Sequence, residues 1–273
     1  MIDKKRITIN QITTNNLSLQ QAVAAYAKAG LRGITPWRDK IEQAGLATSK
    51  AIIADAGLTV TGFCIAGLFT QKGVEGRQVQ IDEARRAIDM AAALGSPSIV
   101  TVVGGLLPGS RSLADARGFA FDALAETLAH ARACGVTLAI EALHPMYAPD
   151  WSVVATLRDA NDWCDRLGEG TGLAVDSYHV WWDPTAAAEI ARAGRAGRLS
   201  ALHVSDWLPD TRSLLLDRGI PGEGVIDNRG IVQTMKEAGF DGWTEVEIFS
   251  ERLWAEPADD VLRRIIHGCS ATL

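Results

Sequence analysis

Cys134-Gly135-Val136-Thr137-Leu138-Ala139-Ile140-Glu141 joins the end of a helix to a short apolar strand that stops at a carboxylate. A glycine directly after a helical pattern adopts the left-handed conformation that ends a helix without a Cβ clash. The run that follows is mostly apolar, as in parallel strands that are buried on both faces. A carboxylate at the end of such a strand is unfavourable unless a partner satisfies it. Glu141 is therefore expected to have a specific partner.

The same order of helical pattern, glycine and strand-like run recurs along the chain. The repeats are about 27 to 42 residues apart, which is the length of one βα unit. The glycines that end the predicted helices are Gly30, Gly57, Gly95, Gly135, Gly168, Gly197 and Gly239.

Between these glycines the pattern predicts eight strands and eight helices in alternation. Strands are expected near residues 6–12, 32–35, 58–64, 98–103, 136–141, 172–176, 199–204 and 243–247. Helices are expected near 18–29, 39–56, 79–94, 112–134, 153–167, 185–196, 228–238 and 257–268. Eight alternating pairs favour the α/β class and a closed (β/α)8 barrel over an open sheet. No linker interrupts the pattern, so residues 1–273 are expected to form one domain.

Composition narrows the classes of partner. The chain has 273 residues, 47% hydrophobic and 22% charged, with a net charge of −6. An acidic balance disfavours a nucleic-acid partner, which usually leaves a basic footprint. The N-terminus has no apolar segment and no stretch approaches the length of a membrane span, so we expect a cytoplasmic protein with no membrane partner. The four cysteines form no C-x-x-C pair and are expected to be buried reduced thiols.

Four polar residues follow or end consecutive predicted strands. They are Glu141, Asp176, His203 and Glu247. The C-terminal ends of barrel strands meet at one rim, and three carboxylates with one imidazole suit Mn²⁺ first, with Mg²⁺ or Co²⁺ as alternatives. Each residue alone also fits an ion pair, a loop cap or a hydrogen-bonded core histidine. Glu245 shares the face of Glu247, so strand alternation does not choose between them.

These motifs resemble the xylose-isomerase-like TIM-barrel superfamily of sugar isomerases and epimerases. The resemblance rests on Glu141, Asp176-Ser-Tyr-His179, His203-Val-Ser-Asp206, Arg218-Gly-Ile-Pro-Gly-Glu-Gly224 and Glu247. It implies that Glu141, Asp176, His203 and Glu247 bind one divalent ion. It further implies that His179 and Arg218 contact a sugar substrate, and that Asp206 contacts the substrate or supports the metal ligands. In such epimerases the two glutamates form the acid and base pair.

A narrower resemblance depends on His144, three residues after Glu141. The stretch Glu141-Ala-Leu-His144-Pro-Met146, together with Asn10–Thr14 and Trp37–Asp39, is similar to the large subunit of bacterial C-glycoside deglycosidases. That resemblance implies cleavage of the C–C bond of 3-keto-C-glycosides and a small β-sandwich partner subunit. His144 would be the general base, because its pKa suits neutral pH; a structural loop histidine is the alternative.

Five tryptophans and two arginines fall in predicted rim loops. Trp37, Arg38 and Trp182 are expected to contact substrate, since aromatic rings stack on sugars and polyphenols. The tryptophans are explained equally well if they fill the end of the barrel or form a protein interface. The arginines are explained equally well as solvated surface charges. The remaining rim candidates are Trp151, Trp181, Trp207 and Arg111.

Four functions therefore stay open. The leading hypothesis is C-deglycosylation with His144 as base, followed by ketose isomerisation or epimerisation with Glu141 and Glu247. An endonuclease IV-like repair enzyme is remote, because its trinuclear zinc site needs more histidines than this chain's five, two of which, His130 and His267, lie in predicted helices. A non-catalytic barrel that binds a partner through its tryptophans is disfavoured by the intact ligand set.

Overall fold

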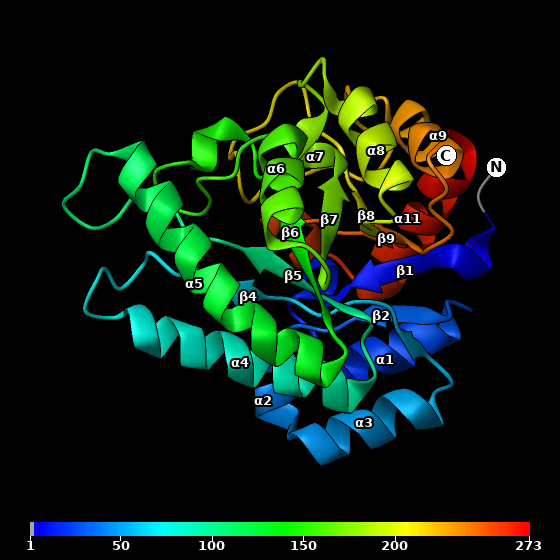
Figure 1. Ribbon diagram of the computed structural model, residues 1–273. Helices are drawn as coiled ribbons and strands as arrows, with labels where there is room; N and C mark the ends of the chain where they lie inside the picture. The colour runs from blue at the N-terminus through cyan, green and yellow to red at the C-terminus, as the bar shows by residue number, and fades with distance from the viewer. Residues whose placement is uncertain (1–2) are drawn as a thin grey trace.

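The computed structural model describes residues 3–273 and shows one parallel sheet surrounded by helices (Figure 1). Neighbouring strands follow the order β3-β2-β1-β9-β8-β7-β6-β5-β4. Among the described residues the strands are β1 (Ile7–Asn10), β2 (Gly33–Thr35), β3 (Thr59–Val60), β4 (Ala66–Gly67), β5 (Ser98–Val102), β6 (Thr137–Glu141), β7 (Thr171–Asp176), β8 (Leu199–Val204) and β9 (Thr244–Val246).

The predicted third strand closes the barrel in two pieces. β3 pairs with β2, and β4 pairs with β5. Between them the Thr61 N–H donates to Ile34 O, and the Val100 N–H donates to Phe63 O. Residues 59–67 thus pair first with β2 and then with β5. β3 and β4 together take the place of one strand, and the barrel closes as an eight-stranded one. The prediction of one continuous strand over 58–64 was wrong for this reason.

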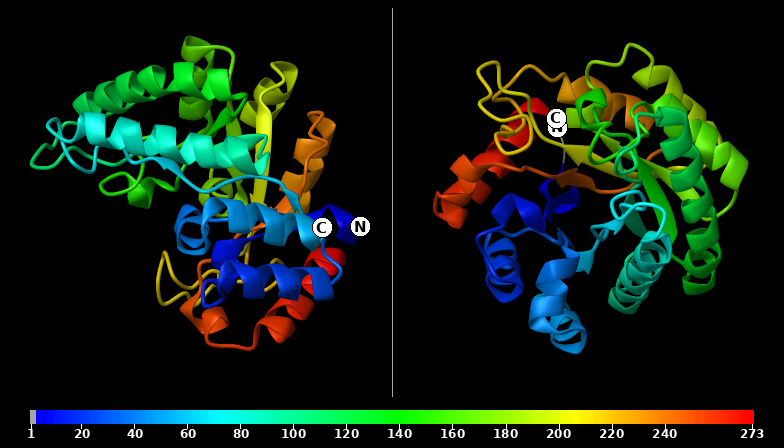
Figure 2. Two further views of the ribbon diagram at one scale, coloured as in Figure 1. Left: turned by 90° about the horizontal axis from the view of Figure 1, so that it is seen from below. Right: turned by 90° about the vertical axis from the view of Figure 1, so that its left-hand side faces the viewer.

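Helices cover the outside of the sheet, as the views in Figure 2 show. The long predicted helix 39–56 is two helices, because Gly45 breaks it with a φ of 81°. The predicted helix 153–167 begins later, where the Thr156 side chain accepts a hydrogen bond from the Asp159 N–H. The helices are α1 (Leu19–Lys28), α2 (Arg38–Ala44), α3 (Leu46–Asp55), α4 (Arg77–Leu94), α5 (Leu113–Cys134), α6 (Leu157–Leu167), α7 (Ser177–Val180), α8 (Ala186–Arg195), α9 (Asn228–Glu237), α10 (Glu251–Trp254) and α11 (Ala258–Thr272), with 3-10 turns at Lys4–Arg6, Gln11–Thr14 and Pro145–Tyr147.

Strand alternation separates an apolar shell from a polar barrel interior. On β1, Ile7 and Ile9 belong to the hydrophobic core between sheet and helices. The Asn10 side chain points the other way, and its Nδ2 donates to Glu245 of β9 and to Glu247, which follows β9. Burial of the apolar face drives the fold at roughly 25 cal/mol per Å². Polar groups gather on the inner face around β1 and β9, where they must find partners. Val100 and Val102 of β5 instead belong to a second, smaller apolar cluster with Cys64, Leu143 and Tyr147. None of the helices among the described residues is both long and apolar enough to span a membrane.

Candidate metal centre

The structure brings the four predicted ligands together at one end of the barrel. Glu141 and Asp176 are the last residues of β6 and β7, His203 lies in β8, and Glu247 follows β9. The four strands are consecutive neighbours in the sheet, and Asp176 pairs directly with His203 in register. One ligand atom from each residue lies within 4.8 Å of the others, and all four residues are buried. The two glutamates come from the outer strands of this arc.

The group fits a hard divalent cation by its unsatisfied atoms and its charge. Glu141 Oε1 and both ring nitrogens of His203 are buried without a hydrogen-bond partner, an unfavourable state unless something else binds them. With Glu245, the interior holds four buried carboxylates. Arg218, and His203 when it is protonated, supply at most two positive charges, so a dication would offset the remainder.

Glu245 lies beside the four ligands and was left undecided by the sequence. Its Oε1 accepts a hydrogen bond from Asn10 Nδ2 at 2.7 Å, and its Oε2 accepts one from Thr35 Oγ1 at 2.5 Å. The same Oε1 is 3.5 Å from His203 Nε2, while Glu141 Oε1 is 3.3 Å from His203 Nδ1. The imidazole is therefore held between two carboxylates. A ligand histidine is commonly oriented in this way by a carboxylate on its second nitrogen.

Arg218 supplies the buried positive charge. Its Nη1 donates to Asp176 Oδ2 at 3.0 Å and to Glu247 Oε2 at 3.2 Å. Its guanidinium lies over the rings of Tyr178 and Phe249, 4.3 Å and 4.9 Å from the centroids. Such stacking is favourable for a desolvated cation. Arg218 is thereby fixed against two of the candidate metal ligands.

His179 also lies at this site, and a main-chain group fixes its tautomer. The His144 N–H points to His179 Nδ1 at 3.2 Å, so Nδ1 accepts and the proton sits on Nε2. Arg218 Nη2, 3.2 Å from Nε2, then faces another donor. Burial, with Arg218 next, lowers the pKa of His179 well below its ordinary value. His179 is therefore a neutral N–H donor at the cavity wall.

The His144 side chain lies outside that wall. Its Nδ1 accepts a hydrogen bond from the Met146 N–H at 3.3 Å, and its ring lies 5.5 Å from the rings of both Trp182 and Trp207. With Nδ1 engaged as an acceptor, Nε2 carries the proton. Burial lowers the pKa of His144. In this arrangement the imidazole has no free lone pair for a base, and the catalytic role of His144 stays a prediction.

Burial makes the carboxylates of the site weaker acids. It raises the pKa of Asp176 to about 6, against which Arg218 acts in the opposite direction. It also raises the pKa of Glu141 and Glu247. For His203, burial alone lowers the pKa, but the carboxylates of Glu245, Glu141 and Glu247 together raise it well above its ordinary value.

A cavity opens directly on these residues. It has a volume of about 590 Å³, its mouth included. Four groups on its wall are polar or charged: Glu141, His179, Arg218 and Glu247. The rest is apolar or aromatic and includes Trp37, Tyr147, Trp151, Phe249, Ile65, Val102, Leu143 and Leu215. The cavity suits a small molecule with a few oxygens on one side and an apolar surface on the other.

The structure divides the other rim candidates. Trp37 lines the cavity, and its Nε1 donates to Asn10 Oδ1. Trp182 instead donates to His179 O and is not on the cavity wall. The Arg38 guanidinium pairs with Glu42 and Glu83 and is not on the wall of this cavity, so its contact with substrate stays a prediction.

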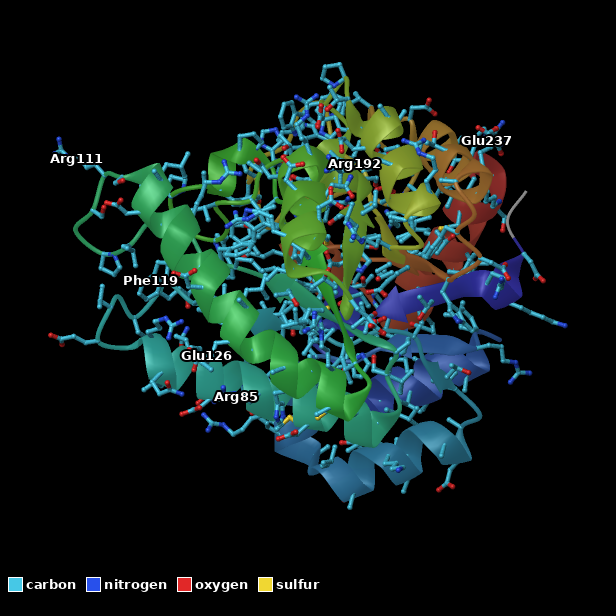
Figure 3. All side chains as sticks on the ribbon, in the orientation of Figure 1. Arg85, Arg111, Phe119, Glu126, Arg192 and Glu237 are labelled. Carbon is cyan, nitrogen blue, oxygen red and sulfur yellow. The ribbon has the colours of Figure 1, made fainter. Side chains whose placement is uncertain are left out.

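Asp206 and Arg111 complete the set of rim predictions. The Asp206 carboxylate accepts hydrogen bonds from the N–H groups of Trp207, Gly222 and Ile226. It therefore organises the loop that carries Arg218, and nothing in this geometry supports a contact with substrate. Arg111 is exposed, and Figure 3 shows it at the outer edge of its loop.

Comparisons with known proteins agree with this fold. Protein SMc04130 from Sinorhizobium meliloti 1021 has a crystal structure that superposes with a TM-score of 0.96, at 44% identity over 99% of both chains. A protein named putative hydroxypyruvate isomerase, from Streptomyces coelicolor, is 26% identical over 94% of this chain and 92% of its own length. The 3-keto-D-glucoside 4-epimerase YcjR from E. coli shares the fold, with a TM-score of 0.77 at 18% identity over 98% of this chain and 99% of that one. The sequence also matches the family model described as xylose isomerase-like TIM barrel over residues 23–266. This chain belongs to the xylose isomerase-like TIM barrel family.

Proposed function

We propose that this protein is a metal-dependent isomerase or epimerase that moves a proton at a carbon next to the carbonyl of a small keto sugar or hydroxy keto acid. One observation carries the proposal. Glu141 and Glu247 both line the cavity, and they come from the two outer strands of the ligand arc. Two carboxylates that flank a carbon can remove and return its proton on different faces. The names of the hydroxypyruvate isomerase and 3-keto-glucoside epimerase relatives support this class of substrate.

Mn²⁺ is our first choice for the ion, with Mg²⁺ or Co²⁺ as alternatives, because the donor set is oxygen-rich with one imidazole. Glu141, Asp176, His203 and Glu247 would hold it. When bound, it supplies a Lewis acid that polarises the substrate carbonyl and acidifies the neighbouring C–H.

The chain's own residues account for the proton transfer. Glu141 and Glu247 line the cavity from the two outer strands of the arc, and either carboxylate can take a proton from a substrate carbon that lies between them. His179 presents a neutral Nε2–H to a substrate oxygen, and Arg218 adds a fixed positive charge beside it. The apolar wall excludes water from the reacting carbon.

Cleavage of 3-keto-C-glycosides is the second candidate. The aromatic wall formed by Trp37, Trp151 and Phe249 favours it, because a flat aglycone fits such a surface. This function would use His144 as base and a small β-sandwich partner subunit. Co-purification tests the partner: recovery of a stoichiometric small subunit would favour cleavage, and a chain that purifies alone and turns over free ketoses would favour isomerisation.

Exchange of the substrate C–H with solvent deuterium distinguishes a glutamate base, Glu141 or Glu247, from His144. Protein loaded with Mn²⁺ is incubated in D₂O with hydroxypyruvate, ketohexoses or 3-keto-glucosides, the paramagnetic ion is removed, and loss of the C–H signal is followed by NMR. We expect exchange with at least one of these compounds, its loss in Glu141→Gln and Glu247→Gln, and its retention in His144→Ala.

Two results would refute the assignment. One is the absence of exchange with every compound while the ion is bound. The other is a His144→Ala variant that keeps the ion but loses exchange, which would return the base to His144. Metal content measured on each variant separates loss of the ion from loss of the base.

A further inference from the structure

A second group of metal-type side chains lies on the outside of the barrel, between α4 and α5. These helices pack side by side (Figures 1 and 2). Asp89 comes from α4, and His130 and Cys134 come from successive turns of α5. The sequence predicts buried reduced thiols and places His130 in a helix. Cys134 is instead partly exposed and free.

The register of the two helices aligns the three groups. One turn earlier on each helix, Arg85 and Glu126 approach across the same seam, with 3.6 Å between Nη2 and Oε1 (Figure 3). The next turn places Asp89 opposite His130. Because residues four apart lie on one helix face, Cys134 then lies beside the same carboxylate.

Three donor atoms meet at one point. His130 Nε2 is 2.7 Å from Asp89 Oδ1, Cys134 Sγ is 3.6 Å from that oxygen, and Cys134 Sγ is 3.7 Å from His130 Nε2. In a relay to a nucleophilic thiol, the imidazole would use one nitrogen for the sulfur and the other for the carboxylate. Here both contacts involve Nε2, so the geometry is that of convergent ligands.

The spacing matches a tetrahedral zinc site. Zn–S and Zn–N bonds of about 2.3 Å and 2.0 Å at a tetrahedral angle separate sulfur from nitrogen by about 3.5 Å. The same arithmetic gives about 3.5 Å between sulfur and oxygen. The two observed sulfur distances agree with these values, and only the contact between Asp89 and His130 has to widen, by about 0.6 Å.

We propose that Asp89, His130 and Cys134 form a peripheral binding site for a thiophilic divalent ion, Zn²⁺ above all. The fourth position is open to water, because the Asp89 and His130 side chains are 60% and 33% exposed. The thiol loses its proton on binding, and the proton passes to solvent. α4 and α5 end just before β5 and β6 begin, so the ion lies toward the end of the barrel opposite the Glu141 site. There it ties two helices together.

A thiolate signal from Cys134 distinguishes this site from the four-ligand Glu141 site, whose ligands include no sulfur; Cys64, which lies beside Glu247, needs its own control. Metal-free, reduced protein is titrated with Co²⁺, and the sulfur-to-cobalt charge-transfer band is followed in the near ultraviolet. We expect the band in the wild type and in Glu247→Gln, and its loss in Cys134→Ser. Loss of a group that only orients a ligand weakens metal binding by about 10–100-fold. Asp89→Asn and His130→Asn remove ligands and should weaken Co²⁺ binding by more.

Cys64→Ser is the matched control, because Cys64 Sγ lies near Glu245 and Glu247 and is the thiol closest to the other site. It should keep the band. A wild type without the band, or a band that survives Cys134→Ser, would overturn the proposal. Circular dichroism of each variant shows that the fold is retained. The zinc content should fall by one ion per chain from the wild type to Cys134→Ser.

Discussion

Asp176→Asn should stabilise the metal-free protein while it destroys the metal site. Burial raises the pKa of the Asp176 carboxyl from 3.8 to about 6, and one pKa unit corresponds to about 1.4 kcal/mol. Ionised Asp176 therefore costs the fold about 3 kcal/mol at pH 7. Asparagine removes the charge and keeps the oxygen that accepts the Tyr178 N–H at 2.8 Å.

Thermal unfolding with and without the ion measures both effects. An unfolding entropy of about 2.1 cal/mol/K per residue gives about 0.6 kcal/mol/K for this chain, so the gain of 3 kcal/mol raises Tm by about 5 °C. If Mn²⁺ binds as proposed, it should stabilise the wild type by about 2.7 kcal/mol at 100 times Kd, and Asp176→Asn should lose this gain.

The control is Asp165→Asn, which changes an exposed carboxylate. Hydrogen bonds from Arg192 and Arg198 lower the pKa of Asp165, so this variant should gain no stability. A metal-free Asp176→Asn protein that melts at or below the wild-type temperature at pH 7 would refute the charge argument. In that case the contact with Arg218 stabilises the fold by more than burial of the carboxylate destabilises it.

Three further outcomes follow from the same geometry. Glu245→Gln should weaken Mn²⁺ binding by about 10–100-fold through the orientation of His203, as measured by calorimetry; unchanged affinity would contradict the contact. The metal-free protein should lose stability as pH rises from about 4 to about 6, because folded Asp176 retains a proton that the unfolded chain has released. Mn²⁺ affinity should rise over the same range. Denaturant melts test the fall in stability, and calorimetry at several pH values tests the rise in affinity. Gly67→Ala should destabilise the fold by about 1–3 kcal/mol. Gly67 has a φ of 111°, and an added Cβ would lie 2.1 Å from Val102 O at the end of β5. An unchanged melting temperature would show that the strand can shift to make room.

The sequence was sufficient to place Glu141, Asp176 and His203 because strand ends in a parallel barrel converge whatever the helices do. It was insufficient for Glu245 and Glu247. A period of two puts both side chains on the inner face, but depth along the barrel axis depends on the register with β8 and β1. That register comes from packing of the whole sheet.

Junctions between elements and contacts between helices were harder to predict. Trp37 and Arg38 are adjacent where β2 passes into α2, and there the side-chain period changes from 2 to 3.6. No local rule predicts which of the two side chains faces the cavity; in the structure it is Trp37. The sequence shows that His130 and Cys134 share a helix face. It does not show that Asp89 lies opposite them, because that depends on how α4 and α5 pack, so the site between these helices was missed.

The buried charge at the centre links stability to function. Four carboxylates face a barrel interior in which Arg218, and a proton on His203, are the positive charges near them. Neither positive charge is compatible with full function of the site. His203 must release its proton before it can bind an ion, and the Arg218 guanidinium, already bonded to Asp176 and Glu247, has fewer N–H groups left for a substrate oxygen. A barrel optimised for stability alone would replace some of these carboxylates by apolar residues, because buried ion pairs are often no better than apolar packing. The presence of four carboxylates here argues that the interior is arranged for a cation that the chain does not itself supply.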